Sequence, residues 1–447
     1  MLVNIHFQFK KTATLLAITI GLLTGTKAGA QVWPLSQCID SAQQLNKQLR
    51  IANNNVGISR QKVQEAKSNL VPQLTVNADY RYFIDLPYQF MPQSAFGGPE
   101  GQFKQVQFGV PHVINANIQL SMPLYSPQLA SAIKTTKIAS GIAGLQYEKT
   151  EEQIIYEVTN LYYNAQILYH RVAFIDSNLL NATKLLQNME LLKKQLLAKK
   201  TDVAKIQLQI GQLTTQRELA YSQYTQVLNA LKLAIGLQLD QIFDIEKNIV
   251  PSTPVVYNES TPVDIRLASH QNLLLNSELD MLKRSRLPSL SLYGSYGQNG
   301  FGYDKAPNDF LKFYPSSFAG VRLAYPLFSG TTTHRQISQK KLELNNNALQ
   351  LSLMNEQATL QVETAKQQRS VAQRSATTTL EQTKLAQSIY DETLLEQSQG
   401  LASLNDVILA DIALREAQQQ YLSAMVDYLK ADLNLKKTTG SLLNKQK

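Results

Sequence analysis

The chain has 447 residues, a hydrophobic fraction of 44%, one cysteine and a formal net charge of +9. The positive charge is spread thinly, without a block of about five or six Lys or Arg residues, which argues against a nucleic-acid partner. A single cysteine, Cys38, excludes an internal disulfide. No run of about 20 apolar residues follows the N-terminus, so no membrane-spanning helix is expected in the mature protein.

Residues 1–30 have the pattern of a secretory signal peptide. Lys10 and Lys11 form the charged region, a short apolar core follows them, and the small residues 28–30 fit a cleavage site. The sequence therefore predicts an exported protein whose mature chain begins after residue 30.

The first part of the mature chain changes its hydrophobic period. Residues 35–70 are predicted to form a helix, which Pro72 ends shortly afterwards. In residues 74–82 and again in 115–122 every second residue is apolar, which predicts two strands with one apolar and one polar face. Residues 84–112, rich in Pro, Gly and aromatic residues, are predicted to be a long loop.

Two very long stretches, 145–210 and 331–399, contain neither Gly nor Pro. An apolar residue recurs in the first stretch in alternating steps of three and four, a mean of 3.5. This spacing predicts a helix with a coiled-coil seam and a left-handed supercoil. At about 1.5 Å per residue such a helix reaches roughly 100 Å. The chain is expected to turn or break after Lys200, Thr201 and Asp202, and a shorter helix then runs to Gly236. The seam consists of Ile154, Val158, Leu161, Ala165, Leu168, Val172, Ile175, Leu179, Ala182, Leu186 and Met189.

The mature chain is an internal duplication. Residues 50–74 match 266–290, residues 121–126 match 324–329, and residues 201–203 match 405–407. The matches share one order and need a single change of offset, which falls in the predicted loop. They predict two repeats, 31–240 and 255–440, each built as helix, strand, loop, strand, long helix and shorter helix.

Strands of about ten residues with one apolar face suit a membrane-spanning barrel, although a soluble sheet with one buried face shows the same alternation. Aromatic residues crowd the strand ends, where barrels meet the membrane interface. Four strands cannot close a barrel, so a trimer with twelve strands and a continuing tube of helices is expected. The aromatic residues are Tyr80, Tyr82, Phe83, Tyr125, Tyr293, Tyr296, Phe318, Tyr325 and Phe328.

Several segments together resemble one family. They are LSQCIDSAQQLNKQLRI, the junctions NLVPQLTV and RLPSLSL, the motifs MPLYS and YPLFSG, and GLASLNDVILA at 400–410. In this order, over essentially the whole mature chain, they are similar to the TolC-type outer membrane efflux proteins. The resemblance implies a homotrimeric channel-tunnel without a cofactor, in the outer membrane of a Gram-negative bacterium. Its twelve-stranded barrel would continue into a periplasmic α-helical barrel that contacts an adaptor protein and an inner-membrane pump.

The resemblance also implies an acidic gate at the periplasmic tip, where each long helix turns into the next. Thr201 and Asp202 occupy that position in the first repeat and Asp406 occupies it in the second, after the turn at Gly400. Three copies of a carboxylate around a narrow pore would select cations. The alternative role for both aspartates is a helix N-cap, and the two roles can coexist. Leu196 stands in the first repeat where Gly400 stands in the second.

The gate departs from the family pattern in its charged partners. Leu409 replaces a second acidic residue and Ala402 replaces a basic one, so Lys199 or Lys200 is the candidate cation for a latch. Adaptor contact is predicted near residues 190–210 and 390–410.

Two other kinds of protein share part of this pattern. A structural periplasmic coiled-coil protein explains the heptads but not the paired strands, and an adaptor would contain one hairpin rather than two. The five His residues are scattered, and the motifs HExxH, GxSxG, CxxC and the phosphate loop are absent, so an enzyme is not expected.

Overall fold

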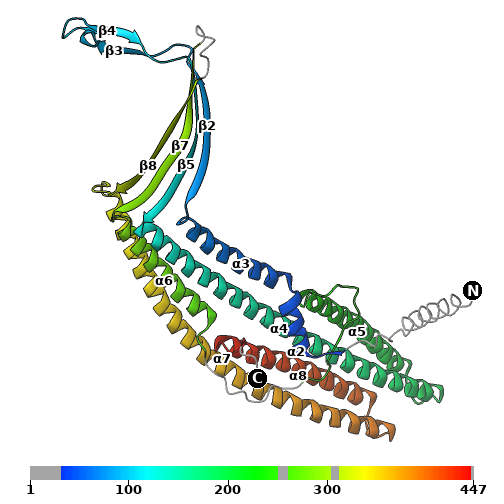
Figure 1. The fold of residues 1–447 in the computed structure, drawn as a ribbon. Coiled ribbons are helices and arrows are strands. Elements are labelled where there is room, and N and C mark those ends of the chain that lie inside the picture. The colour runs from blue at the N-terminus through cyan, green and yellow to red at the C-terminus, as the bar shows by residue number, and fades with distance from the viewer. Residues whose placement is uncertain (1–31, 250–259, 304–311, 444–447) are drawn as a thin grey trace, which may run out of the picture. The chain divides into compact units, whose positions relative to one another are not determined.

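The computed structural model describes residues 32–249, 260–303 and 312–443, and Figure 1 shows its elements. The predicted signal peptide, residues 1–30, lies outside the described residues. The chain forms two compact units. The first unit comprises residues up to 50, 150–260 and 360 onward, and the second comprises 51–149 and 261–359. No helix in the described part of the chain is both long and apolar enough to cross a membrane.

The second unit contains a four-stranded antiparallel sheet in the order β2-β5-β7-β8. Its strands are β2 (Gln73–Tyr82), β5 (His112–Tyr125), β7 (Ser289–Gly302) and β8 (Lys312–Ala324). The alternation that predicted strands at 74–82 and 115–122 is confirmed, and β5 extends beyond its predicted bounds at both ends. Strands from the two halves of the chain join where β5 pairs with β7.

The register gives this sheet one polar and one apolar face, because directly opposed residues share a face. Asn117 pairs with Asn77 on one side and with Gly297 on the other, whereas Ile118 pairs with Val76 and Tyr296. The polar face carries Gln73, Thr75, Asn77, Asp79, Asn115, Asn117, Gln119, Ser121, Ser295, Asn299 and Ser316. The apolar face carries Leu74, Val76, Ala78, Tyr80, Ile114, Ala116, Ile118, Leu120, Leu292, Tyr296, Ala319 and Val321.

Two of the aromatic residues at the strand ends lie on the polar face. Tyr293 pairs with Ser121 and Phe318 pairs with Ser295, so both belong to the polar face. Both therefore lie off the apolar face of the sheet, and their location at a membrane interface stays a prediction. Strand ends alone do not indicate a face, because a shift of one residue in register moves a side chain to the other side.

The segment predicted as the loop 84–112 contains a second small sheet. The strands β3 (Tyr88–Pro92) and β4 (Phe103–Gln107) pair antiparallel around the short 3₁₀ helix η1 (Gln93–Phe96). This hairpin projects from the ends of β2 and β5 (Figure 1). The expectation of a structureless loop was wrong because the two five-residue strands are short and separated by Pro and Gly residues.

The helices of the second unit hold one another through polar pairs. They are α3 (Lys47–Ser68), α6 (Val263–Arg284) and the first parts of α4 (Pro127–Lys194) and α7 (Thr332–Ser398). Thr135 Oγ1 and Ser277 Oγ lie 2.8 Å apart, and Lys340 Nζ donates to Glu278 Oε2 at 2.9 Å. Helix α6 is thereby tied to both long helices. Helix α4 begins well before residue 145, because Pro127 is suited to a first helical position and Ser126 Oγ accepts from Leu129 N at 3.2 Å.

The first unit contains α2 (Leu35–Leu45), α5 (Lys200–Ala234), α8 (Leu404–Thr438) and the later parts of α4 and α7. A short parallel pair joins β1 (Val32–Trp33) to β6 (Asp244–Ile245). The predicted helix 35–70 is two helices that separate at Asn46. Its Oδ1 accepts from Gln48 N at 2.8 Å and its Nδ2 donates to Ala234 O at 2.7 Å. Cys38 is fully buried, and this burial raises the pKa of its thiol to about 12.

The predicted heptad seam of α4 supplies much of the core in this unit. Among its members Ile154, Val158, Ala165, Ile175, Ala182 and Met189 are buried. Ile175 and Ala182 pack with Leu213 and Ala220 of α5, which closes the first hairpin. Another cluster joins both hairpins and contains Leu185, Met189, Val203, Ile206, Tyr390, Leu404, Val407, Ala410 and Leu414.

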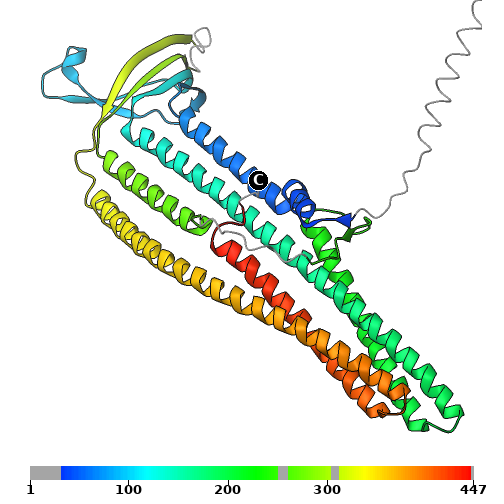
Figure 2. The same ribbon diagram turned by 90° about the horizontal axis from the view of Figure 1, so that it is seen from below.

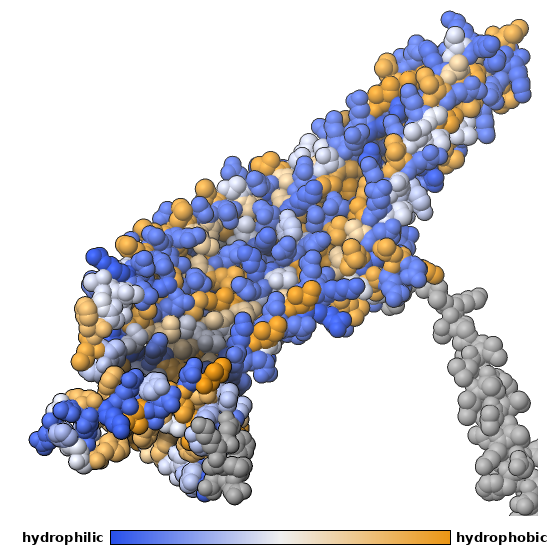
Figure 3. All heavy atoms as spheres, turned by 90° about the horizontal axis from the view of Figure 1, so that it is seen from above, coloured by the Kyte–Doolittle hydropathy of each residue, from blue (hydrophilic) through white to orange (hydrophobic). Residues whose placement is uncertain are grey.

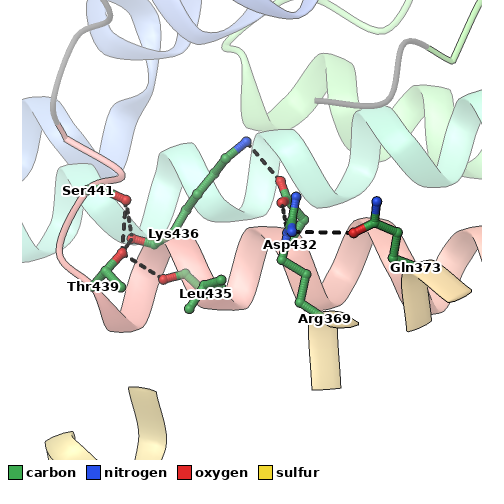
Figure 4. A network of polar contacts seen from close by, with 7 residues as sticks. All are labelled: Arg369, Gln373, Asp432, Leu435, Lys436, Thr439 and Ser441. Carbon is green, nitrogen blue, oxygen red and sulfur yellow. Dashed lines mark hydrogen bonds and ion pairs between the residues drawn. The ribbon is translucent and has the colours of Figure 1, made fainter. Parts of the chain in front are cut away.

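The second hairpin, α7–α8, has an ionic cross-link in addition to its apolar core (Figure 4). Arg369 Nε of α7 donates to Asp432 Oδ1 at 2.6 Å, and Lys436 Nζ lies 2.9 Å from Asp432 Oδ2. The side chain of Asp432 is only 4% exposed. A buried carboxylate requires such compensation, because desolvation disfavours its charge.

Candidate functional site

The turn between α4 and α5 holds a leucine in a left-handed backbone conformation. Leu196, with φ of +64°, is the only non-glycine residue with positive φ among those that the structure describes. Leu196 N donates to Lys193 O at 3.0 Å and Leu197 N donates to Leu192 O at 2.9 Å, the two bonds of a Schellman motif. A β-carbon in this region costs about 1–2 kcal/mol.

The turn between α7 and α8 has the same hydrogen bonds with the residue that suits them. Gly400, at φ of +78°, donates through N to Gln397 O at 3.1 Å, and Leu401 N donates to Glu396 O at 2.9 Å. Gly400 therefore occupies the left-handed position of the motif that ends α7. Leu196 and Gly400, aligned by the repeat, occupy equivalent positions of equivalent motifs.

Thr201 and Asp202 lie in the first turn of α5 rather than in the connecting turn. The turn comprises residues 195–199, and α5 begins at Lys200. Asp202 is the third residue of the helix, and its Oδ2 accepts from Lys199 N at 3.3 Å. Thr201 is exposed. The break expected after Asp202 thus comes earlier, because the Schellman bonds end α4 at Lys194.

Asp406 occupies the equivalent third position of α8 but has a complete capping box. Ser403 donates to Asp406 Oδ2 through its N at 2.8 Å and through its Oγ at 2.6 Å. Asp406 N donates back to Ser403 Oγ at 3.3 Å. These bonds, first from the Ser403 side chain and then from its backbone, lower the pKa of Asp406. The N-caps are therefore Lys199 and Ser403, and the two aspartates close the caps from within the helix.

The two turns lie side by side at one end of the first unit, as Figures 1 and 2 show. Beneath them the shared apolar cluster packs Val203 and Ile206 against Val407. Lys205 Nζ donates to Asn405 Oδ1 at 3.0 Å across the two hairpins. The fold thus brings the predicted gate residues of both repeats to the same tip. Within the described part of one chain, neither Asp202 nor Asp406 forms an ion pair with Lys199 or Lys200.

Sequence reasoning missed two features of the tip. The first is its exposed leucines: Leu196, Leu197 and Leu401 are 93%, 72% and 77% exposed. The position after a Schellman glycine often carries an apolar residue, and this signal could have indicated Leu401.

The second missed feature is a buried carboxylate, Asp411, next to the tip core. Gln209 Nε2 donates to Asp411 Oδ2 at 2.6 Å, and Arg415 Nε lies 2.8 Å from the same oxygen. Desolvation raises the pKa of Asp411 in spite of the opposing charge of Arg415. The first repeat has Gln207 at the position equivalent to Asp411. A comparison of the two repeats therefore does not indicate a buried carboxylate at this position.

A sheet with one apolar and one polar face, together with two helical hairpins whose acidic tips meet, defines the class of outer membrane channel-tunnels. The family model described as outer membrane efflux protein matches residues 263–441. Outer membrane protein TolC of Salmonella enteritidis is 22% identical in an alignment that covers 97% of this chain and 87% of TolC.

Solved structures share the fold. The outer membrane protein VceC of Vibrio cholerae superimposes with a TM-score of 0.73 at 16% identity, covering 91% of this chain and 96% of VceC. The CmeC outer membrane channel of Campylobacter jejuni gives a TM-score of 0.69 at 16% identity, with 91% and 85% coverage. Together, the family model and the TolC relatives support a TolC-type outer membrane efflux protein. Among the described residues no cluster of His, Cys, Asp or Glu is arranged to hold a metal ion.

Proposed function

We propose that three copies of this chain form an outer membrane channel-tunnel that passively conducts substrates from an inner-membrane pump and its adaptor to the exterior. The protein is a transport component of the outer membrane that extends into the periplasm, and not an enzyme. The proposal keeps the predicted division into a signal peptide, 1–30, and two repeats, 31–240 and 255–440.

The open edges of the sheet carry the proposal. Strands β2 and β8 each have one partner within the sheet, and four alternating antiparallel strands leave its two edges running in opposite directions. The β8 edge of one copy can therefore pair antiparallel with the β2 edge of the next, a head-to-tail contact that closes into a ring. Three copies give a barrel of twelve strands, whose closure removes every edge, as lipid requires.

The two faces of the sheet suit the two sides of such a barrel. Leu74, Val76 and Leu323 are all strongly exposed on the apolar face, which would meet lipid. The opposite face, rich in Asn, Gln, Ser and Thr, would line a water-filled channel.

Exposed apolar residues on the helices support further contacts between copies. Ile51 and Ile58 of α3 are seven residues apart, as are Leu342 and Leu349 of α7, and all four are exposed. Hydrophobic residues also lie among hydrophilic ones along the helices on the face shown in Figure 3. Heptad-spaced exposed residues on separate helices are the pattern of a coiled-coil seam that lacks its partner. Measuring the mass of the purified protein in detergent tests the trimer. The expected protein mass is three times that of one chain.

The proposed gate consists of Thr201, Asp202 and Asp406 at the hairpin tips, with Gly400 shaping the second turn. Three-fold symmetry would place six carboxylates around the tip aperture. Such a ring favours cations over anions at the aperture.

Conductance of the purified protein in a planar bilayer tests both channel and gate. The native channel is expected to have a small, cation-selective conductance, and Asp202→Ala and Asp406→Ala are expected to enlarge it or to reduce its selectivity. Asp427→Ala is the matched control, because Asp427 is an exposed carboxylate of α8 far from the tip. Silence of the trimeric native protein and of both tip variants would favour the structural coiled-coil alternative.

The adaptor is proposed to contact the leucines of the tips. Leu197 and Leu401 expose apolar side chains beside the gate, and exposed apolar patches mark interaction sites. A photoreactive residue at position 401 is expected to cross-link a periplasmic adaptor in cells. Position 219, an exposed leucine in the body of α5, is the control, and cross-linking there but not at 401 would contradict the tip contact.

A further inference from the structure

The polar face of the sheet contains a row of three side chains from β7 and β8. Tyr293 lies opposite Gly320, and the rings of Tyr293 and Phe318 meet edge to face with centroids 6.0 Å apart. On the other side of Gly320, the guanidinium carbon of Arg322 lies 4.9 Å from the centroid of the Tyr293 ring. Phe318, Tyr293 and Arg322 therefore form one contiguous surface.

Gly320 allows the tyrosine ring to lie against the sheet. A β-carbon at Gly320 would be only 3.0 Å from Cζ and from Oη of Tyr293. The ring thus covers a glycine, which stabilises a strand pair by shielding its backbone. This contact accounts for the position of Tyr293 but not for Phe318, a residue that is 56% exposed on a face otherwise rich in Asn, Gln, Ser and Thr.

The charge of Arg322 is held on an aromatic ring. Among the residues that the structure describes, no carboxylate forms an ion pair with Arg322. Arg81, on the same face, does pair with a carboxylate, since its Nε lies 2.8 Å from Asp79 Oδ2. Stacking on Tyr293 orients the guanidinium plane while its N–H donors remain able to bind an anion.

We propose that Phe318, Tyr293 and Arg322 form a binding site for planar aromatic anions on the wall of the channel. An aromatic ring of the ligand packs against Phe318 and the edge of Tyr293, and its carboxylate or sulfonate binds the Arg322 guanidinium in bidentate fashion. The location on the channel wall rests on the proposed function, since it requires the polar face to line the channel. A trimer would contain three such sites.

Isothermal titration calorimetry of the full-length, detergent-solubilised protein with naphthalene-2-carboxylate tests the site. Arg322→Gln is expected to weaken binding by about tenfold or more, since it removes a charged hydrogen-bonding group. Phe318→Ala is expected to weaken binding about threefold through the loss of ring packing. The neutral naphthalene-2-methanol should bind about tenfold more weakly than the carboxylate.

Arg81→Gln is the matched control, because it removes the same charge from the same face and should leave the affinity unchanged. Equal losses in Arg81→Gln and Arg322→Gln, or no binding to the native protein at millimolar ligand, would overturn the site. Tyr293→Phe keeps the ring over Gly320 and should retain binding, so it remains informative if Phe318→Ala prevents folding.

Bilayer recordings separate this site from the proposed channel. Naphthalene-2-carboxylate added to a conducting channel is expected to block the current, and Arg322→Gln should relieve the block. Binding without block in a conducting channel would overturn the location on the channel wall. Binding by a protein that never conducts would support the site and contradict the channel, and conduction without binding would overturn the site alone.

Discussion

The two helical hairpins are built from repeated sequence, yet their ends are held differently. The α4–α5 turn places Leu196 in the left-handed region and caps α5 with a lysine, whose backbone makes one 3.3 Å bond to Asp202. The α7–α8 turn uses Gly400 and a reciprocal Ser403–Asp406 capping box. The second tip is thus unstrained and fully capped, whereas the first is strained and half capped.

The ion pairs between the helices also differ, and the second hairpin again has the stronger contact. Arg369 and Asp432 cross-link α7 to α8 inside the protein, while Arg217 and Asp176 join α5 to α4 at the surface. The repeat places two uncharged residues, an alanine at 165 and a leucine at 228, where Arg369 and Asp432 stand. The matching segments therefore share the course of the backbone but not the polar contacts that stabilise it. The tip of the α4–α5 hairpin is therefore expected to change conformation more easily than the tip of the α7–α8 hairpin.

The largest difference should appear when the cross-links are removed. Asp432→Ala leaves two largely buried cations without their carboxylate, and the free energy of unfolding should fall by about 3 kcal/mol. Asp176→Ala, the matched change in the first hairpin, removes an exposed pair and should have little effect. Urea unfolding followed by helical circular dichroism measures both, and equal losses would remove this distinction between the hairpins.

Exchanging the turn residues should reverse the strain. Gly400→Leu is expected to destabilise the end of α7 by about 1–2 kcal/mol, because φ stays positive. No atom lies within 4 Å of a β-carbon built at Gly400, so crowding does not contribute. Leu196→Gly should stabilise the end of α4 by about 1 kcal/mol. Amide hydrogen exchange of the two helix ends measures these changes, and faster exchange in Leu196→Gly would refute the account.

The smallest expected effect concerns the caps. Ser403→Ala removes the N-cap oxygen and should destabilise the start of α8 by about 1 kcal/mol. It also removes the main cause of the lowered pKa of Asp406. Lys199→Ser introduces the missing cap at α5 and should slow amide exchange there.

The pH dependence of the α8 cap follows from the direction in which the pKa of Asp406 is shifted. Because the pKa of Asp406 is lowered in the folded protein, the carboxylate keeps its charge as the pH falls through the ordinary carboxyl range. The stabilisation of the cap is lost only when the pH passes the folded pKa. In an Asp202→Asn background, Ser403→Ala should lose cation selectivity at a higher pH than the parent. Reversal potentials measured from neutral to acid pH test this, and identical profiles would show that Ser403 does not control the Asp406 charge.

Several parts of the tip could be predicted from the sequence and others could not. The alignment of Leu196 with Gly400 and of Asp202 with Asp406 follows from the repeat, and it places equivalent residues in equivalent turns. The partners of the carboxylates do not follow from it. A third-position aspartate and an N-cap aspartate differ by three residues at a helix start, and only backbone geometry separates them.

The sequence by itself determined what is periodic. This comprises the two long helices, two strands in the first half from alternation, and the matching order of segments in the two halves of the chain. These properties are local, since each residue contributes to the pattern through its own place in a helix or strand. Tertiary structure alone decided what depends on distant partners. It set the pairing of β5 with β7, the face that carries Tyr293 and Phe318, the break at Asn46 and the ion pair between Arg369 and Asp432. Strand register and buried charge pairs join residues far apart in the chain, and no local period records which of them meet.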